Sequence, residues 1–391
     1  PISAYIGFDC TANSLHVGSL LPIMGLARMQ RFGHTPIALV GGGTGLIGDP
    51  SGKTAERQLL TKEKVAENIE GIRAQLSHFL DFERNGNPAR IENNHDWLGS
   101  LQLIDFLRDT GKHFTVNYML SKESVKRRIE SEDGISYTEF SYQILQGMDF
   151  LRLYETYNCV LQTGGSDQWG NLTSGTDLVH KALGVSVHAL GTPLITNSDG
   201  TKFGKSEGNA VWLDSELTSP YALFQFWLNT DDRDVIDRLK VFTFLTRAEI
   251  EELEAAVADT PHLRAAQKRL AEEVTTIVHG PDQTQAVKEA SEALFGKGEL
   301  EGLDPATLES ALRELPHATV TAETTVAQAL VDTGLCQSLS EARRAIAQGG
   351  VSINNQGIED DGALVGAPRA PLPAGVVLKR GKKTLAGLFY A

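Results

Sequence analysis

The segment that most constrains the fold is residues 157–171, in which a short apolar run with β character ends at Gly164-Gly165. Two glycines after a strand let the main chain approach a ligand at a point where any Cβ would collide. Ser166 and Asp167 then open a segment with a helical pattern, and we expect Ser166 to cap that helix. The exposed amides of a first helical turn favour an anionic or oxygen-rich ligand. The segment therefore predicts an open α/β sheet that binds a ligand where this strand ends.

The order of patterns along the chain predicts three folded parts. Residues 4 to about 215 alternate short β-rich runs with longer helical patterns, which is typical of a doubly wound α/β domain. From Ser219 to about Leu294 the pattern is helical and rich in Ala, Glu, Leu and Arg. The last part combines a basic helix at 340–346 with a glycine turn and a strand, as in a small α+β module. The first part is expected to contain the strands Ala4–Phe8, Pro36–Val40 and Cys159–Gln162 and the helices Leu15–Phe32 and Lys62–Phe79.

Domain boundaries follow from these changes of composition. We expect residues 1–217 to form a Rossmann-like α/β domain and residues 218–295 to form an α-helical domain. Residues 296–323 hold several glycines and prolines around one short helix and are the expected linker. Residues 324–391 are expected to form the small α+β domain.

Composition excludes several classes of protein. Apolar residues make up 41% and charged residues 22% of the 391 residues, as in ordinary soluble globular proteins. The longest apolar runs are far too short to span a bilayer, so we expect no membrane association and a cytoplasmic location. Three widely separated cysteines without a C-x-x-C pair argue against a structural zinc site and fit a reducing compartment. Because the chain begins at Pro1, without a methionine or a lead-in helix before its first predicted strand, we expect further residues to precede it.

The charge distribution limits contact with nucleic acid to particular faces. A net charge of −14 argues against a protein that coats nucleic acid indiscriminately. From Thr324 to Ala391, however, seven Lys and Arg residues minus five Asp and Glu residues give +2. An acidic body with a mildly basic tail is compatible with local RNA contact.

Two separate motifs suggest a phosphate site. Residues 9–19 follow the first strand and open a helix, which places His16 in a first turn whose unpaired amides favour phosphate. Thr11 adds a hydroxyl. Lys202 and Lys205 flank a glycine in a loop, and two ammonium groups on a loop suit a clamp that closes on phosphates. A lone histidine is commonly structural and a lone basic loop commonly solvated, but the two motifs together favour a nucleotide site.

A glycine-rich segment offers an alternative reading. Gly43, Gly45 and Gly48 fit the dinucleotide fingerprint G-x-G-x-x-G after the strand that ends at Val40. A dehydrogenase should run straight from that motif into a helix, whereas residues 49–52 intervene here. A nicotinamide-dependent dehydrogenase is therefore the weaker alternative, and failure to bind NAD would remove it.

The helical pattern at residues 136–154 predicts a wall of a binding pocket. Tyr142, Gln146 and Asp149 recur at i, i+4 and i+7, so phenol, amide and carboxylate share one helix face. A polar stripe is commonly a solvated face. Large apolar residues beside this stripe favour an inward orientation.

These motifs, in this order, resemble those of bacterial-type tyrosyl-tRNA synthetases over nearly the whole chain. Residues 164–171 resemble the family's Gly-Gly-Ser-Asp-Gln-Trp-Gly-Asn signature. Residues 16–19 resemble the His-Ile-Gly-His signature of class I aminoacyl-tRNA synthetases, and residues 202–206 resemble their lysine-loop signature. The chain departs from the family at Ser19, where the family has a second histidine, and this weakens the role of that position in nucleotide binding.

The resemblance implies a pocket for tyrosine. Asp149 would accept a hydrogen bond from the substrate phenol, and Tyr5 would donate one to it. This pair also distinguishes the tyrosyl enzymes from their tryptophanyl relatives, which share the fold and the phosphate motifs. The substrate ammonium group would be held by Tyr142, Gln146 and Asp49, and its carboxyl region by Gln168.

The resemblance also implies an ATP site, with Mg²⁺ accompanying ATP and no tightly bound protein metal. Thr11, His16, Lys202 and Lys205 would be catalytic because they would meet the leaving phosphates, and Asp167 would bind the adenylate ribose. The implied set of ATP contacts is completed by Gly7, Asp9, Ser19, Gly165 and Ser206.

For the rest of the chain the resemblance implies RNA binding. The helical domain would bind the anticodon, and the tail resembles an RNA-binding module first known from a small-subunit ribosomal protein. The implied activity is the ATP-dependent attachment of tyrosine to tRNA(Tyr) by a homodimer. A non-catalytic RNA-binding descendant is the other alternative, and the intact phosphate motifs argue against it. The basic residues that would meet RNA phosphates are Arg343, Arg344, Lys379, Arg380, Lys382 and Lys383.

Overall fold

The structure is a computed structural model of the chain. It forms two compact units, Pro1–Asp214 and Ser215–Ala391, each of which is described by itself. No helix within the described ranges is long and apolar enough to cross a membrane. The structure describes residues 1–51, 59–132, 134–201, 203–206, 209–295, 300, 302–366, 374–381 and 384–391, with the backbone alone at 205, 206 and 209.

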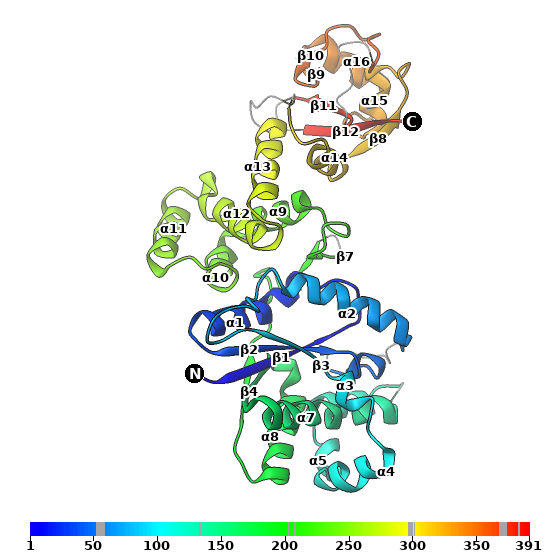
Figure 1. Cartoon of the computed structure of the whole chain (residues 1–391). Coiled ribbons are helices and arrows are strands. Elements are labelled where there is room, and N and C mark those ends of the chain that lie inside the picture. Colours follow the sequence, from blue (N-terminus) through cyan, green and yellow to red (C-terminus); the bar gives the residue numbers. More distant parts are fainter. Residues whose placement is uncertain are drawn as a thin grey trace. The chain divides into compact units, whose positions relative to one another are not determined.

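The first unit is built on a parallel sheet with the strand order β3-β2-β1-β4-β5 (Figure 1). The chain leaves β1 toward β2 and β3 on one side and later continues through β4 and β5 on the other. The strand order therefore reverses between β1 and β4, and open α/β sheets bind ligands at such a switch point, beyond the carboxyl ends of the strands. The strands are β1 (Ser3–Asp9), β2 (Thr35–Gly41), β3 (Arg90–Asn93), β4 (Cys159–Gly165) and β5 (His188–Thr192), and each neighbouring pair is parallel.

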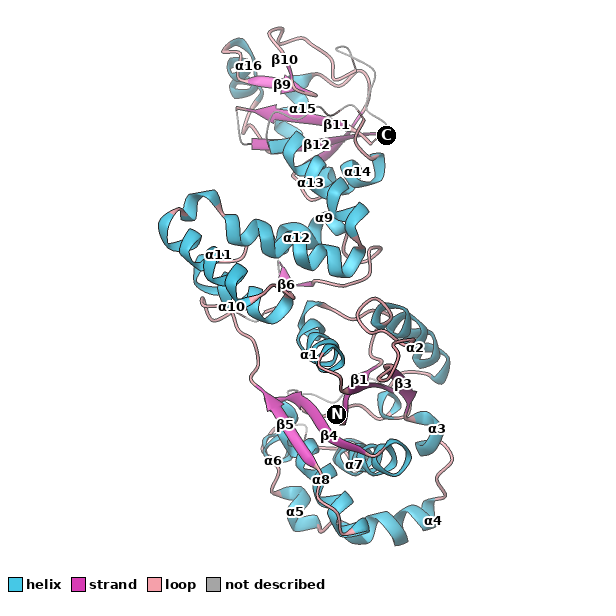
Figure 2. Cartoon of the chain, turned by 60° about the vertical axis from the view of Figure 1, so that its left-hand side comes forward, coloured by secondary structure: helices cyan, strands magenta, loops and turns pink. Residues whose placement is uncertain are grey.

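Helices cover both faces of this sheet, so the predicted doubly wound α/β architecture is confirmed. The first two long helices, α1 and α2, lie on one side of the sheet, and α7 and α8 lie on the other (Figures 1 and 2). Strand β2 is buried along nearly its whole length, as expected for a strand covered on both faces. The long helices are α1 (Leu20–Arg31), α2 (Lys62–Leu76), α7 (Tyr137–Tyr157) and α8 (Trp169–Leu183). The connection between β3 and α7 carries α3 (His95–Leu98), α4 (Leu103–Asp105), α5 (Val116–Leu120) and α6 (Glu123–Ile129).

The first helix begins later than the sequence predicted. A 3₁₀ turn, Val17–Ser19, precedes α1, which begins at Leu20 rather than at Leu15. The Leu15 carbonyl accepts a hydrogen bond from the Leu213 amide at 2.9 Å, and the Val17 amide donates to the Val211 carbonyl at 2.8 Å. Backbone pairing with a distant segment therefore replaces the first helical turn.

The predicted cap at Ser166 is wrong. A 3₁₀ turn, Ser166–Gln168, follows Gly165 directly and leads into α8, and neither of these two starts has a side-chain cap. A Cβ at position 165 would meet the Asp167 carboxylate, so a larger residue there would displace that side chain.

One apolar core of the first unit lies between the sheet and helices α7 and α8. The Tyr5 ring of β1 packs edge-on against Phe150 of α7, with ring centroids 5.3 Å apart. Helix α8 comes close to this core at Gly175, where a Cβ would stand 3.1 Å from Phe150. The buried cluster consists of Tyr5, Ile37, Leu39, Phe150, Leu153, Cys159, Val179 and Val187.

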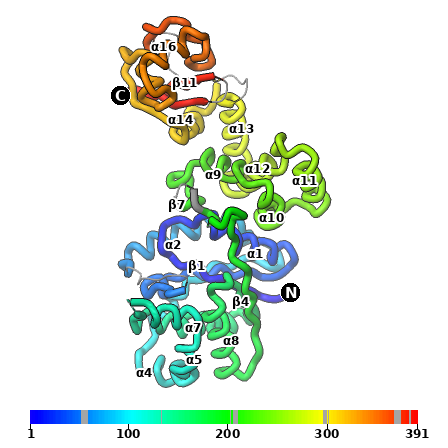
Figure 3. Tube along the Cα trace, turned by 180° about the vertical axis from the view of Figure 1, so that it is seen from behind, coloured from blue at the N-terminus to red at the C-terminus, as the bar shows by residue number. Residues whose placement is uncertain are grey.

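The second unit begins with an α-helical module, as predicted (Figures 1 and 3). Its central helix, α12, buries one apolar face that includes Leu270, Val274 and Val278. The helices are α9 (Pro220–Leu228), α10 (Asp232–Phe242), α11 (Arg247–Asp259), α12 (Ala265–His279) and α13 (Pro281–Phe295).

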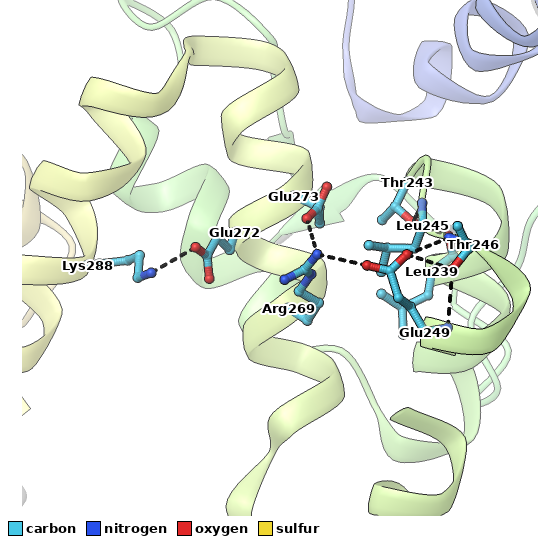
Figure 4. A network of polar contacts seen from close by, with 9 residues as sticks. All are labelled: Leu239, Thr243, Leu245, Thr246, Glu249, Arg269, Glu272, Glu273 and Lys288. Atoms are coloured by element: carbon cyan, nitrogen blue, oxygen red, sulfur yellow. Dashed lines mark hydrogen bonds and ion pairs between the residues drawn. The ribbon is translucent and has the colours of Figure 1, made fainter. Parts of the chain in front are cut away.

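Polar contacts link α12 to the neighbouring helix α11 (Figure 4). Arg269 lies 2.9 Å from Glu273, one turn further along α12, and 3.4 Å from Glu249 of α11. Glu249 also closes a capping box with Thr246, whose amide donates to the Glu249 carboxylate at 2.8 Å. Exposed ion pairs contribute at most about 1 kcal/mol each, so the buried helix faces dominate the stability of the module.

The C-terminal part forms the expected α+β module with its own core. Its sheet has the order β10-β9-β11-β12-β8. The buried cluster includes Val326, Leu330, Ile346, Leu378 and Leu388. The elements are β8 (His317–Val320), α15 (Val326–Asp332), α16 (Leu339–Ala347), β9 (Val351–Ile353), β10 (Gln356–Gly357), β11 (Val376–Arg380) and β12 (Thr384–Tyr390).

The structure places two elements in the stretch 296–323 that we expected to be a linker. Helix α14 (Pro305–Arg313) contacts β12, and β8 is an edge strand that runs parallel to β12. The contact is close at Gly387, where a Cβ would stand 2.7 Å from the Leu312 carbonyl oxygen. The sheet therefore begins before residue 324. The sequence did not predict β8, because a four-residue strand that pairs with the far end of the module leaves no local signal.

We predict that Gly387→Ala destabilises the C-terminal module by about 1–3 kcal/mol, because the added methyl must displace the α14 backbone. Gly357→Ala is the matched control, since Gly357 lies in the same sheet with nothing within 4 Å of a built Cβ. Urea unfolding of both variants measures the difference. Equal stabilities would show that α14 does not rest on β12 as described.

Candidate active site

A cavity of about 280 Å³ lies at the carboxyl ends of β1 and β4. This is the switch point of the sheet, and α7 supplies a further wall. Among the predicted site residues, those that line the cavity are Tyr5, Gly7, Asp9, Asp49, Tyr142, Gln146, Asp149, Gly165 and Gln168. The polar residues Thr44, Asn94 and Gln162 also line it.

Asp149 is a fully desolvated carboxyl group held by two donors. The Asn94 side-chain amide donates to one carboxylate oxygen at 3.0 Å, and the Trp97 indole donates to the other at 2.8 Å. Burial raises the pKa of Asp149 to about 7, although both hydrogen bonds act in the opposite direction. The carboxyl group therefore titrates close to neutral pH.

Tyr5 presents a buried hydroxyl to the same cavity. The side chain is 1% exposed, and its hydroxyl has no hydrogen-bond partner among the described residues. Gln162, its neighbour across the β1–β4 pairing, is likewise buried with an unpartnered side-chain oxygen. Buried polar groups without a partner are rare and costly, so these two atoms indicate a polar ligand.

A second polar cluster surrounds Tyr142. Its hydroxyl lies 3.1 Å from both carboxylate oxygens of Asp9, and the Thr44 hydroxyl donates to Asp9 at 3.2 Å. Burial, followed by the nearby carboxylates of Asp9, Asp49 and Asp149, raises the pKa of Tyr142 well above its usual value. Tyr142 therefore remains a neutral hydrogen-bond donor in a region of negative potential.

Asp49 and Gln168 lie together beside α8. The Gln168 amide donates to one Asp49 oxygen at 2.7 Å. The buried Asn171 amide lies 3.3 Å from the other Asp49 oxygen and 3.1 Å from the Gln168 side-chain oxygen. The Ser51 amide also donates to Asp49 at 2.9 Å. These contacts fix the orientation of a carboxylate and an amide toward the cavity.

Four residues of the predicted ATP site, Thr11, His16, Ser19 and Asp167, are not among the described residues that line this cavity. Thr11, His16 and Asp167 are exposed, and Ser19 is half-buried. The His16 ring stands edge-on to Trp212 with centroids 6.1 Å apart. Desolvation by surrounding atoms lowers the pKa of His16, which favours its neutral form.

The lysine loop is described in part. Lys202 lies outside the described residues, and of Lys205 and Ser206 only the backbone is described, as strand β6 (Lys205–Ser206) paired with β7 (Asn209–Ala210). Gly204, at φ +85, approaches the Gly18 amide so closely that a Cβ would stand 3.2 Å from it. The backbone of this loop therefore lies against the turn that follows His16.

The G-x-G-x-x-G segment does not lead into a long helix. Gly43 precedes a single 3₁₀ turn, Thr44–Leu46, and Gly48 adopts φ +88. The Asn94 side chain accepts a hydrogen bond from the Gly43 amide at 2.7 Å. This loop belongs to the cavity wall rather than to a dinucleotide-binding turn.

The predicted RNA-contacting residues differ in their surroundings. Arg343 and Arg344 are exposed on α16, and Lys379 is half-buried on β11. Lys382 and Lys383 lie outside the described residues.

Arg380 is engaged within its own domain. Its guanidinium donates to the Glu341 carboxylate at 2.7 Å and to the Leu335 carbonyl. This side chain joins β11 to the start of α16, so a structural role accounts for its contacts.

Sequence reasoning missed the residues that orient the predicted ones. Asn94 and Trp97 hold Asp149, Asn171 holds Asp49, and Thr44 holds Asp9. A signal was present for Asn94, which follows β3 directly and so stands at the carboxyl end of a parallel strand.

We predict that the stability of the protein falls as the pH rises through about 7, relative to an Asp149→Asn variant. A carboxyl group whose pKa is raised in the folded state stabilises the fold at low pH, and this contribution is lost as the pH approaches the folded-state pKa. The slope is at most about 1.4 kcal/mol per pH unit. Denaturant unfolding at pH 5, 6, 7 and 8 measures it. Parallel stability curves for the two proteins would contradict a raised pKa at Asp149.

Two sequence families match successive parts of the chain. The family described as tRNA synthetases class I (W and Y) matches residues 1–296. A second family, the tyrosine–tRNA ligase SYY-like C-terminal domain, matches residues 307–386, which include α14 and β8.

Individual relatives match over most of their length. The tyrosine–tRNA ligase of Leifsonia xyli subsp. xyli is 62% identical over 391 residues, which are 100% of this chain and 88% of the relative. That of Streptomyces avermitilis is 55% identical over 389 residues, with 99% and 92% covered. A C-terminally truncated mitochondrial tyrosyl-tRNA synthetase from Aspergillus nidulans superposes with a TM-score of 0.69 at 32% identity, covering 75% of this chain and 86% of that one. The chain therefore belongs to the class I tRNA synthetases of the W and Y family, and within that family to the tyrosyl-tRNA synthetases.

Proposed function

We propose that this chain is a tyrosine–tRNA ligase. It activates tyrosine with ATP to give tyrosyl-adenylate and pyrophosphate, then transfers the tyrosyl group to the 3′-terminal adenosine of tRNA(Tyr). The observation that carries this proposal is the pairing of an unpartnered Tyr5 hydroxyl with the Asp149 carboxylate in one cavity. A phenol both donates and accepts hydrogen bonds, so a substrate tyrosine satisfies the two groups together.

The spacing along α7 supports a tyrosine lying lengthwise in the cavity. Asp149 follows Tyr142 by seven residues, which is about 10 Å along a helix. This span is comparable to the distance between the phenol and the ammonium group of an extended tyrosine. The ammonium group is assigned to Tyr142, Gln146 and Asp49, where the nearby Asp9 adds to the negative potential.

Positioning carries the chemistry of adenylate formation. An oxygen of the substrate carboxylate attacks the α-phosphorus of ATP, and the bond from that phosphorus to the pyrophosphate oxygen breaks. No covalent intermediate with the protein is needed, so orientation and electrostatics lower the barrier. Gln168, held by Asp49 and Asn171, orients the carboxyl region, and Asp167 is assigned to the ribose.

The leaving phosphates are assigned to Thr11, His16, Lys202 and Lys205. A neutral His16 donates one hydrogen bond without needing to be protonated, which agrees with its lowered pKa. Mg²⁺ accompanies the ATP phosphates as part of the substrate. Further contacts to ATP are assigned to Gly7, Asp9, Ser19, Gly165 and Ser206.

Transfer to RNA uses the second unit. A ribose hydroxyl of the tRNA attacks the tyrosyl carbonyl, and AMP leaves. The helical module is assigned to the anticodon, and the C-terminal module to RNA phosphates through Arg343, Arg344, Lys379, Lys382 and Lys383. Arg380 supports this surface indirectly, through its contact with Glu341.

We further propose that the protein is a cytoplasmic homodimer without membrane association. Several large apolar side chains are exposed in the connection between β3 and α7 and at the first residue of α7, and exposed apolar patches mark protein interfaces. These are Leu103 (68% exposed), Ile104 (70%), Val116 (60%) and Tyr137 (72%).

We predict that tyrosine supports ATP–pyrophosphate exchange and that phenylalanine is disfavoured by several orders of magnitude. That scale is the one known for tyrosine-specific synthetases rather than one calculated from this site. Tyr5→Phe should lower kcat/KM for tyrosine about tenfold and leave that for phenylalanine unchanged, because only tyrosine uses the lost hydrogen bond. Exchange assays with tyrosine, phenylalanine and tryptophan decide this, and comparable values for phenylalanine would refute the assignment.

We predict that removal of residues 316–391 leaves tyrosyl-adenylate formation largely intact and strongly impairs tRNA charging. The C-terminal module has its own buried core, and α14 would remain in contact with α9 and α13. Loss of phosphate contacts weakens RNA binding, which in the intact protein should fall with added salt. Pyrophosphate exchange and tRNA charging are compared for both proteins. A folded truncated protein that charges tRNA as well as its parent would exclude an RNA-binding role for the module.

A further inference from the structure

Helix α2 contacts the loop that connects β1 to His16 at several points along one face. The fully buried Asn68 side chain donates to the Cys10 carbonyl at 2.9 Å. One turn later, Gly71 lies so close to the loop that a Cβ would overlap the Asn13 carbonyl oxygen. A further turn along, Gln75 accepts a hydrogen bond from the Leu15 amide at 2.8 Å. Positions i, i+3 and i+7 share a helix face, so α2 holds this loop along its length.

The Ser14 hydroxyl is the centre of this contact. It donates to the Leu15 carbonyl at 2.8 Å and accepts from the Gln75 side-chain amide at 2.9 Å. It also accepts from the Asp214 amide at 3.2 Å. A hydroxyl has one donor and two acceptor sites, so every site of this buried group is used.

On its other side the loop pairs with residues 211–214. The hydrogen bonds of Leu15 and Val17 with this segment flank an antiparallel bridge between His16 and Trp212. The same segment follows the lysine loop, because the Val211 amide donates to the Gly204 carbonyl at 3.1 Å. The loop that carries His16 therefore lies between α2 and the base of the lysine loop.

We propose that Gln75, acting through Ser14, is a positioning residue for adenylate formation. It touches neither ATP nor tyrosine. Its side-chain oxygen accepts a hydrogen bond from the Leu15 amide, and its side-chain nitrogen donates one to the Ser14 hydroxyl. These two bonds hold residues 14 and 15 and thereby set the position of the His16 imidazole relative to residues 211–214. The inference rests on the proposed function, because it assigns His16 to the phosphates that leave in that reaction.

The physical reason is that His16 is held by a backbone bridge and an edge-on ring contact with Trp212, both of which depend on the position of its loop. Its side chain is exposed, its backbone is extended at φ −121° and ψ 170°, and the turn after it has no side-chain cap. Misplacement of a catalytic group by about 1 Å can cost on the order of 100-fold in rate. The Gln75 side-chain amide supplies a donor to Ser14 and an acceptor to Leu15. Two bonds at adjacent residues fix both the distance of the loop from α2 and its orientation.

The test compares Gln75→Met with Glu70→Met, an exposed position of the same helix. Methionine keeps the length of glutamine but loses both hydrogen bonds. We expect Gln75→Met to lower the rate of tyrosyl-adenylate formation about tenfold or more at saturating ATP, with KM for tyrosine unchanged and the Glu70→Met variant indistinguishable from the parent. A purely structural role would lower the Tm and leave the rate of the folded protein unchanged.

Two further variants keep the result interpretable if Gln75→Met folds poorly. Gln75→Glu retains the acceptor for Leu15 and should lose less activity. Gly71→Ala, although alanine favours helix by about 1 kcal/mol, should slow adenylate formation because it displaces Asn13. Normal rates in both folded variants would overturn the proposal.

A double-mutant cycle with His16→Ala tests the route of the effect. If Gln75 acts through His16, Gln75→Met should change the rate little once the imidazole is absent, so the two losses are not additive. Full additivity would overturn the proposal. Tyrosine-dependent exchange by the parent protein distinguishes failure of the proposed function from failure of the role of Gln75. Absence of this exchange would refute the proposed function. Normal exchange by the parent together with a fully active Gln75→Met variant would refute the role of Gln75 alone.

Discussion

The parallel pairing of β1 with β4 is the contact on which the rest of the site depends. The chain turns to opposite sides of the sheet from these two strands, so no crossover covers the place where both end. The pairing sets Tyr5 opposite Gln162 and brings Asp9 and Gly165 to the same cavity. A tightly packed core beneath, with Phe150 against the Tyr5 ring, then holds these groups rigidly. The strand order therefore determines where the cavity lies, and the individual residues determine what the cavity can bind.

The cavity buries polar groups whose hydrogen-bonding or charged forms are not fully satisfied by the protein. Asp149 has lost its solvent, and the Tyr5 hydroxyl lacks a partner. A buried group without its hydrogen bond costs about 1–3 kcal/mol, and the apolar core offsets that cost in the absence of substrate. A substrate hydroxyl restores the missing interactions, whereas a substrate without it leaves them missing. On the proposed function, a smaller amino acid is rejected because it leaves buried polar groups unpaired, since the walls of a pocket cannot exclude a smaller substrate sterically.

The sequence predicted the elements with local signals and missed those set by distant partners. The 3.6-residue period placed Tyr142, Gln146 and Asp149 on one face of α7, and all three line the cavity. Asn94 and Trp97 were missed, because only the folded chain brings the residues that follow β3 beside Asp149 of α7. The same cause explains the late start of α1 and the unexpected strand β8, since both depend on pairing with segments far along the chain. Periodicity reports which face of an element is buried, but it does not report what that face meets.

Ser19 stands where the family has a second histidine, which bears on the proposed phosphate contacts. In this structure Ser19 precedes α1 without forming a side-chain cap. On the proposed assignment, a larger share of the charge stabilisation falls on His16 and Thr11, which lie in the connection between β1 and α1. Loops gain precision only from the contacts that anchor them. The bonds from α2 to the loop before His16, and from residues 211–214 to its other side, are therefore where the geometry of this part of the site is determined.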